Sequence, residues 1–81
     1  MRFRKINTPE RFAAAQDSFG LNNTDMAAEL RLSKDGRETV RRYRDGSNTR
    51  GIPGPVQLAM EAFMSGWRPS GVRFPCDERK G

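Results

Sequence analysis

The chain has no histidine, a single cysteine and no long hydrophobic run, and each absence excludes a class of protein. Without histidine or carboxylates at ligand spacing, the usual general bases and metal ligands are missing, so we expect no enzyme, metal, cofactor or small-molecule ligand. Cys76 has no partner for an internal disulfide, so an oxidising compartment is not indicated. No apolar segment reaches the length of a membrane span or signal-peptide core, so we expect a cytoplasmic protein without a membrane partner.

Arginine, by contrast, is abundant. Fifteen Lys and Arg residues stand against ten Asp and Glu residues, which gives a net charge of +5. Residues 31–50 alone carry seven basic and three acidic side chains. Guanidinium groups match phosphate oxygens and base edges through paired hydrogen bonds, so a basic segment of this kind favours a polyanionic partner. An ordinary solvated face is the simpler alternative.

Residues 35–46 (DGRETVRRYRDG) predict a short helix that carries its own caps. Asp35 and Glu38 have the spacing of a capping box, in which the side chain of each residue accepts a hydrogen bond from the backbone amide of the other. Gly46 supplies the left-handed residue that commonly ends a helix. The segment is therefore expected to form a short helix with a defined start and end.

The same segment predicts one buried and one basic face. Val40 and Tyr43 lie three residues apart, so both can point into a core. The arginines fall outside that face or at its border: Arg37, Arg41, Arg42 and Arg44. A helix with a small apolar anchor and a guanidinium-rich outer face suits the major groove of DNA.

Three further helices are predicted from caps and apolar spacing, so the expected fold class is all-α with four to five helices. The first follows Thr8 and Pro9 and ends at Gly20, with a core of Phe12, Ala15 and Phe19. The second covers about residues 24–31, with an apolar stripe of Met26, Ala27 and Leu30. A loop over residues 47–55 leads to the fourth, from Pro55 to about Ser65.

The fourth helix is apolar around more of its surface than one core contact requires, because only Gln57, Glu61 and Ser65 form a polar strip. We expect the excess to form a homodimer interface, with Leu58, Met60, Phe63, Met64 and Trp67. The alternative is that the terminal segment folds back over this helix and supplies Trp67 and Phe74 as aromatic contacts. The expected organisation is a basic arm (1–7), a helical domain with a dimerisation helix (8–66) and a tail (67–81).

The second and third helices resemble the helix-turn-helix of the phage Cro-like and lambda-repressor-like superfamily. The matching positions are Ala27, Leu30, Leu32, Ser33, Thr39, Val40, Arg42, Tyr43, Asp45 and Gly46. A narrower likeness is to the small anti-CRISPR-associated regulators, through the MRF start, Thr8-Pro9, Ala-Ala-Glu-Leu at 27–30, and Val56, Gln57, Ala59 and Glu61. The sequence departs from the pattern of this family at two places. Arg31 stands where the family usually has the turn glycine, and the link from Ser33 to Thr39 is about three residues longer than usual.

The resemblance implies a homodimeric transcriptional repressor of a phage or mobile-element operon in the bacterial cytoplasm, binding an inverted-repeat operator on double-stranded DNA. It places base readers at Arg37, Glu38, Arg41 and Arg42. It places phosphate contacts at Asn23, Thr24, Lys34, Thr39, Arg44 and Arg50. For Glu38, the capping box is a competing role. Two other functions remain open: a phage-encoded inhibitor of a host protein, and an RNA-binding helical module.

Overall fold

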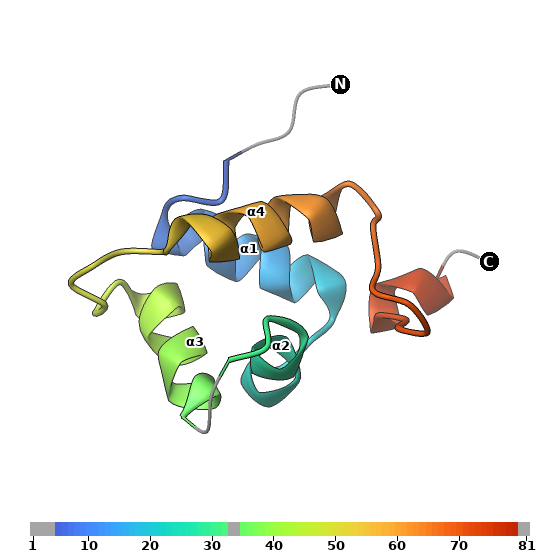
Figure 1. The fold of residues 1–81 in the computed structure, drawn as a ribbon, viewed down its shortest axis with the longest axis horizontal. Coiled ribbons are helices and arrows are strands. Elements are labelled where there is room, and N and C mark those ends of the chain that lie inside the picture. The colour runs from blue at the N-terminus through green and yellow to red at the C-terminus, as the bar shows by residue number, and fades with distance from the viewer. Residues whose placement is uncertain (1–4, 33–34, 80–81) are drawn as a thin grey trace.

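The structure is a computed structural model that describes residues 5–32 and 35–79 of the 81-residue chain. Its helices are α1 (Pro9–Phe19), α2 (Asn23–Glu29), α3 (Gly36–Asp45) and α4 (Gly54–Met64), followed by the short 3-10 helix η1 (Pro75–Arg79). The two described stretches contain no strand, so the expected all-α class is confirmed. In Figure 1, α2 and α3 lie together on one side of α1, and α4 runs along another side.

Local capping fixes the ends of α1 where the sequence predicts them. The Thr8 hydroxyl accepts a hydrogen bond from the Arg11 amide at 3.2 Å, and Pro9 occupies the first turn. Gly20 ends the helix with φ of 80°. A Cβ at this glycine would lie 2.8 Å from the Pro75 Cβ, so the end of α1 also packs directly against η1.

Small residues let α2 and α3 approach each other closely. Gly36 is buried at the start of α3, and a Cβ there would lie 2.8 Å from the Cβ atoms of both Ala27 and Leu32. The helix α2 ends at Glu29, two residues before its predicted end, because Arg31 adopts a left-handed φ of 57° and turns the chain. The start of α3 therefore packs directly against Ala27 and Leu32, with no room for a side chain at position 36.

The core draws on segments from both sides of the expected 8–66 domain. Ile6 is buried, and Phe74 is only 1% exposed. The Phe74 ring centroid lies 5.1 Å from that of Phe63 and 5.3 Å from that of Phe19. The fold-back alternative for the terminal segment therefore applies to Phe74, and the Trp67 ring also makes an aromatic contact, stacked on Phe63 with 5.9 Å between centroids. The core residues are Ile6, Phe12, Ala15, Phe19, Met26, Ala27, Val40, Tyr43, Ile52, Val56, Met60, Phe63 and Phe74.

An ion pair holds the returning segment in place. The Arg68 guanidinium lies 4.0 Å from the centroid of the Phe74 ring and donates from Nε to Asp77 Oδ2 at 2.9 Å. It also donates from Nη1 to the carbonyl oxygen of Phe63 at 2.8 Å, which ties it to the last turn of α4. Stacking of a guanidinium on an aromatic ring and paired bonds to a carboxylate are both favourable for arginine.

The expected dimer interface on α4 needs correction. Met60 is 0% exposed and Phe63 is nearly as deeply buried, so both belong to the core of the single chain and cannot face a partner. Leu58, Met64 and Trp67 are exposed, at 68%, 49% and 55%. Leu58 and Met64 lie about 120° apart around the helix, because successive residues are about 100° apart. The exposed apolar surface of α4 is therefore smaller than the sequence predicts, and its two members, Leu58 and Met64, lie on different sides of the helix.

Among the described residues, no helix is both long enough and apolar enough to cross a membrane.

Candidate nucleic-acid interface

The helix α3 has the two faces that the sequence predicts. Val40 and Tyr43 are buried, and the Tyr43 ring packs edge-on against Phe12 with 5.4 Å between centroids. Burial also raises the pKa of the Tyr43 hydroxyl. The predicted base readers Arg37, Glu38, Arg41 and Arg42 are all exposed, and Arg44 is partly buried at the border of the face. The α3 anchor therefore fixes which side chains point outward.

The predicted capping box does not form. Asp35 has φ of −97° and ψ of 25°, unlike the extended backbone of a capping residue, and its carboxylate accepts no hydrogen bond from the described first turn of α3. Glu38 instead accepts hydrogen bonds from Arg41, one turn further along. A charged guanidinium is a stronger donor than a backbone amide, so it takes the Glu38 carboxylate away from the cap.

Arg41 is bound on both sides by carboxylates, and we call Glu38, Arg41 and Asp45 the Arg41 clamp. Arg41 Nε lies 3.0 Å from both Glu38 oxygens, and Arg41 Nη2 also donates to Glu38 Oε1. Arg41 Nη1 donates to Asp45 Oδ2 at 2.8 Å. The other Asp45 oxygen accepts from the Ser47 amide at 2.8 Å, which joins the clamp to the end of α3.

The pKa values of the two acids in the clamp are both lowered. Hydrogen bonding to Arg41 lowers the pKa of Glu38, and the nearby charges of Arg41, Arg42 and Arg37 act in the same direction. The pKa of Asp45 is lowered first by its hydrogen bonds with Ser47 and then by the charges of Arg41 and Arg42. Glu38 Oε1 also lies 3.9 Å from Arg42 Nε, which is an ion-pair distance and too long for a hydrogen bond.

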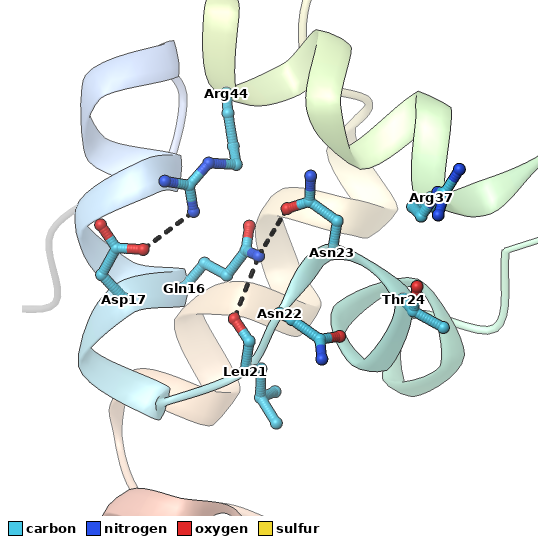
Figure 2. A pocket seen from close by; sticks show the side chains of 8 residues that line it. All are labelled: Gln16, Asp17, Leu21, Asn22, Asn23, Thr24, Arg37 and Arg44. Carbon is cyan, nitrogen blue, oxygen red and sulfur yellow. Dashed lines mark hydrogen bonds and ion pairs between the residues drawn. The ribbon is translucent and has the colours of Figure 1, made fainter.

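An open cleft of about 570 Å³ lies between α1, the start of α2 and α3 (Figure 2). Its lining combines amide, hydroxyl and guanidinium groups from three elements: Gln16, Asp17, Leu21, Asn22, Asn23, Thr24, Arg37 and Arg44. Figure 2 shows Arg44 beside α1 and Arg37 at the opposite edge, beyond Thr24. The cleft thus brings together four predicted contacts, namely Asn23, Thr24, Arg37 and Arg44.

Gln16 fixes the orientation of Asn23 in this cleft. Gln16 is 1% exposed, and its Nε2 donates to the Leu21 carbonyl oxygen at 3.2 Å and to Asn23 Oδ1 at 2.9 Å. Because Asn23 accepts through its oxygen, its NH₂ group is left to donate elsewhere (Figure 2). Gln16 is not among the residues predicted from the sequence; the only signal for it is its position four residues after Phe12, on the core side of α1.

Arg44 is tied to α1 by an ion pair. Arg44 Nη1 donates to Asp17 Oδ1 at 2.9 Å across the cleft, and less than a third of the Arg44 side chain is exposed. Asp17 is largely exposed, so the pair lies at the mouth of the cleft. A second carboxylate or a phosphate oxygen could therefore reach the same guanidinium from the solvent side.

A second hollow of about 250 Å³ lies beside the C-terminal end of α3. It is lined by Asn7, Pro9, Arg42, Tyr43, Gly46, Asn48, Thr49, Gly51 and Ile52. Arg42 is its charged member, whereas Arg37 and Arg44 line the larger cleft. The larger cleft thus runs along α3 from Arg37 to Arg44, and the second hollow lies at the C-terminal end of the same helix.

The remaining predicted phosphate contacts lie elsewhere. The Thr39 hydroxyl donates to the carbonyl oxygen of Asp35 at 3.3 Å, within its own helix. Arg50 is exposed in the loop between α3 and α4 and lines neither hollow. Lys34 and the turn residue Ser33 lie outside the described residues.

Within residues 5–32 and 35–79, no group of three His, Cys, Asp or Glu side chains is close enough together to hold a metal ion. In comparisons with known proteins, no protein-family model, curated protein or solved structure matches the chain. The likeness to the helix-turn-helix regulators consequently remains a prediction from the sequence motifs.

Proposed function

We propose that the chain is a sequence-specific DNA-binding transcriptional repressor in which α2 and α3 form a helix-turn-helix. In this proposal α3 lies in the major groove of an inverted-repeat operator, and the protein acts as a homodimer in the bacterial cytoplasm. The observation that carries the proposal is the outer face of α3, where exposed arginines stand on a buried anchor of Val40 and Tyr43.

The shape of the surface around α3 supports contact with duplex DNA. A helix in the major groove is flanked by two phosphate backbones, so polar groups are needed on both sides of it. The larger cleft supplies such groups along α3 between Arg37 and Arg44, and the second hollow supplies them beside its C-terminal end. Arg42 and Arg37 are the proposed guanine readers, because the other described residues leave their guanidinium groups largely unpaired.

The larger cleft supplies the proposed backbone contacts. Asn23 is held with its NH₂ group unused by Gln16, and Thr24 and Arg44 line the same cleft. Amide, hydroxyl and guanidinium donors are the groups that most often bind phosphate oxygens. A phosphate at this position would compete with Asp17 for Arg44, so the ion pair between α1 and α3 would loosen on binding.

The dimer part of the proposal rests on Leu58 and Trp67. Both are large apolar side chains with more than half of their surface exposed. A symmetric dimer would bury them and would present two copies of α3 to successive major grooves, about 34 Å apart.

The experiment that tests the function is in vitro selection from a randomised duplex library, followed by fluorescence-anisotropy binding at two salt concentrations. We expect an enriched inverted repeat that binds about 10³-fold more tightly than scrambled duplex. Arg42→Ala should reduce operator affinity by about 1–3 kcal/mol and relax the preference at one base pair. Arg73→Ala removes the same charge from the exposed C-terminal segment and should leave the preference unchanged.

Equal, weak and steeply salt-dependent binding to all duplexes would contradict the proposal, because that pattern requires only a basic surface. Absence of duplex binding at low salt would favour the inhibitor of a host protein, and preferential binding of single-stranded RNA would favour the RNA module.

A further inference from the structure

We propose that Arg41 is a positioning residue and not a base reader: the Arg41 clamp holds the Glu38 carboxylate beside Arg42 and so directs the Arg42 guanidinium toward DNA. This inference rests on the proposed DNA-binding function. It divides the four predicted readers into a contacting set, Arg37 and Arg42, and a supporting set, Glu38 and Arg41.

The first step is that no pair of N–H groups on Arg41 is available to bind a base. All three of its guanidinium nitrogens donate to carboxylates, two of them to Glu38 and one to Asp45. Bidentate recognition of guanine needs two neighbouring N–H groups directed at the base edge. Contact between Arg41 and DNA would therefore require at least one side of the clamp to open.

The second step is the spacing along α3. Glu38 lies three residues before Arg41 and Asp45 four residues after it, so the three side chains form one row along the helix. A single exposed ion pair is weak, but a guanidinium held from both sides loses much of its freedom to rotate. The Ser47 amide further restrains Asp45 at the end of the row.

The third step connects the row to Arg42. Glu38 Oε1, which accepts from Arg41, is also 3.9 Å from Arg42 Nε. No other described residue forms a hydrogen bond or ion pair with Arg42, so its Nη atoms remain available for the O6 and N7 acceptors of guanine. Arg42 thus has its Nε at ion-pair distance from Glu38 and its Nη atoms available, whereas every guanidinium nitrogen of Arg41 donates to a carboxylate.

The test compares Arg41→Gln, Arg41→Lys and Arg42→Gln with the unaltered protein, with Arg73→Gln as the charge-matched control. Each variant is measured by selection from a randomised duplex library and by the salt dependence of binding to scrambled duplex. Gln and Lys are good helix formers, so α3 should be retained, and circular dichroism verifies this. Lys keeps the charge but has one nitrogen, which cannot hold both carboxylates in the same fork geometry.

If the inference is right, Arg41→Gln and Arg41→Lys both relax the preference at the base pair that Arg42→Gln also relaxes. The double variant Arg41→Gln/Arg42→Gln should then be no less specific than Arg42→Gln alone, because Arg41 acts only through Arg42. The slope of log K against log salt should be the same for Arg41→Gln and Arg73→Gln.

Three results would overturn the inference while leaving the DNA-binding function intact. The slope could fall by about 0.9 for Arg41→Gln alone, which would make Arg41 a phosphate contact. The preference could relax at a different base pair, which would make Arg41 a reader, or it could stay unchanged. If the unaltered protein enriches no sequence at all, the proposed function itself fails, and this inference fails with it.

Discussion

Arg31 carries the clearest backbone strain in the described chain. It is the only non-glycine residue there with a positive φ, and that conformation forces the Cβ of an L-amino acid close to a carbonyl oxygen. One exposed hydrogen bond offsets part of this strain: Arg31 Nη1 donates to the carbonyl oxygen of Ala28 at 2.9 Å.

We therefore predict that Arg31→Gly stabilises the protein by about 0.5 kcal/mol. The relief of left-handed strain, roughly 1–2 kcal/mol, should exceed the added chain entropy of glycine, roughly 0.5–1 kcal/mol. Chemical denaturation measures the change. The matched control is Arg42→Gly in the interior of α3, where the same substitution should destabilise by about 1 kcal/mol. Destabilisation of similar size at both positions would show that the turn carries no strain.

The pKa of Glu38 offers a test of the Arg41 clamp without DNA. Arg41 lowers this pKa below its ordinary value of 4.5, so the clamp contributes stability that is present above pH 4.5. The contribution is lost as the pH falls through the lowered pKa of the folded state. In Arg41→Gln we predict that the pKa of Glu38 rises toward 4.5, as measured by NMR titration of the side-chain carboxyl carbon. An unchanged pKa would mean that Arg41 does not hold this carboxylate in solution.

At the scale of the helices, the sequence predicts most boundaries because they depend on nearby residues. Thr8, Pro9 and Gly20 act within one turn of α1, and Gly46 acts within one turn of α3. The capping box failed because Glu38 had a second possible partner at a comparable spacing, and only the folded geometry decides between them. The role of Gly36 was also missed, since its need for a small side chain arises from α2.

The candidate site was predictable to a similar extent. The outward position of the α3 arginines follows from the spacing of Val40 and Tyr43, which one helix determines alone. The contact of Gln16 with Asn23 joins two elements across a turn, so no local pattern encodes it. Met60 and Phe63 were assigned to a dimer because hydrophobicity does not indicate which partner covers a side chain.

The exposed side of α4 gives a prediction at this scale. Leu58→Glu should shift the protein toward monomer in sedimentation equilibrium with little loss of folded structure, because Leu58 is not part of the core. Met60→Glu should instead unfold the chain, because it would bury an unpaired carboxylate where no water reaches. A dimer that persists in Leu58→Glu would place the interface on another surface, and a protein that is monomeric from the start would remove the dimer from the proposal.

For the whole molecule, Phe74 connects the C-terminal segment to α1 and α4. We predict that Phe74→Ala lowers the free energy of unfolding by about 3–5 kcal/mol, the usual cost of removing a fully buried phenylalanine ring. Trp67→Ala should cost less, because more than half of that side chain is already exposed. Thermal unfolding followed by circular dichroism measures both changes. Equal costs would indicate that the segment packs differently in solution.

The late position of Phe74 also links folding to the order of synthesis. A ribosome produces α1, α2 and the arginine-bearing α3 long before the ring that closes the core between Phe19 and Phe63. The contact between Phe19 and Phe74 joins residues 55 positions apart, so it must wait for residue 74 to emerge. Products of premature termination would carry the basic surface on an open core, and we expect proteases to remove them.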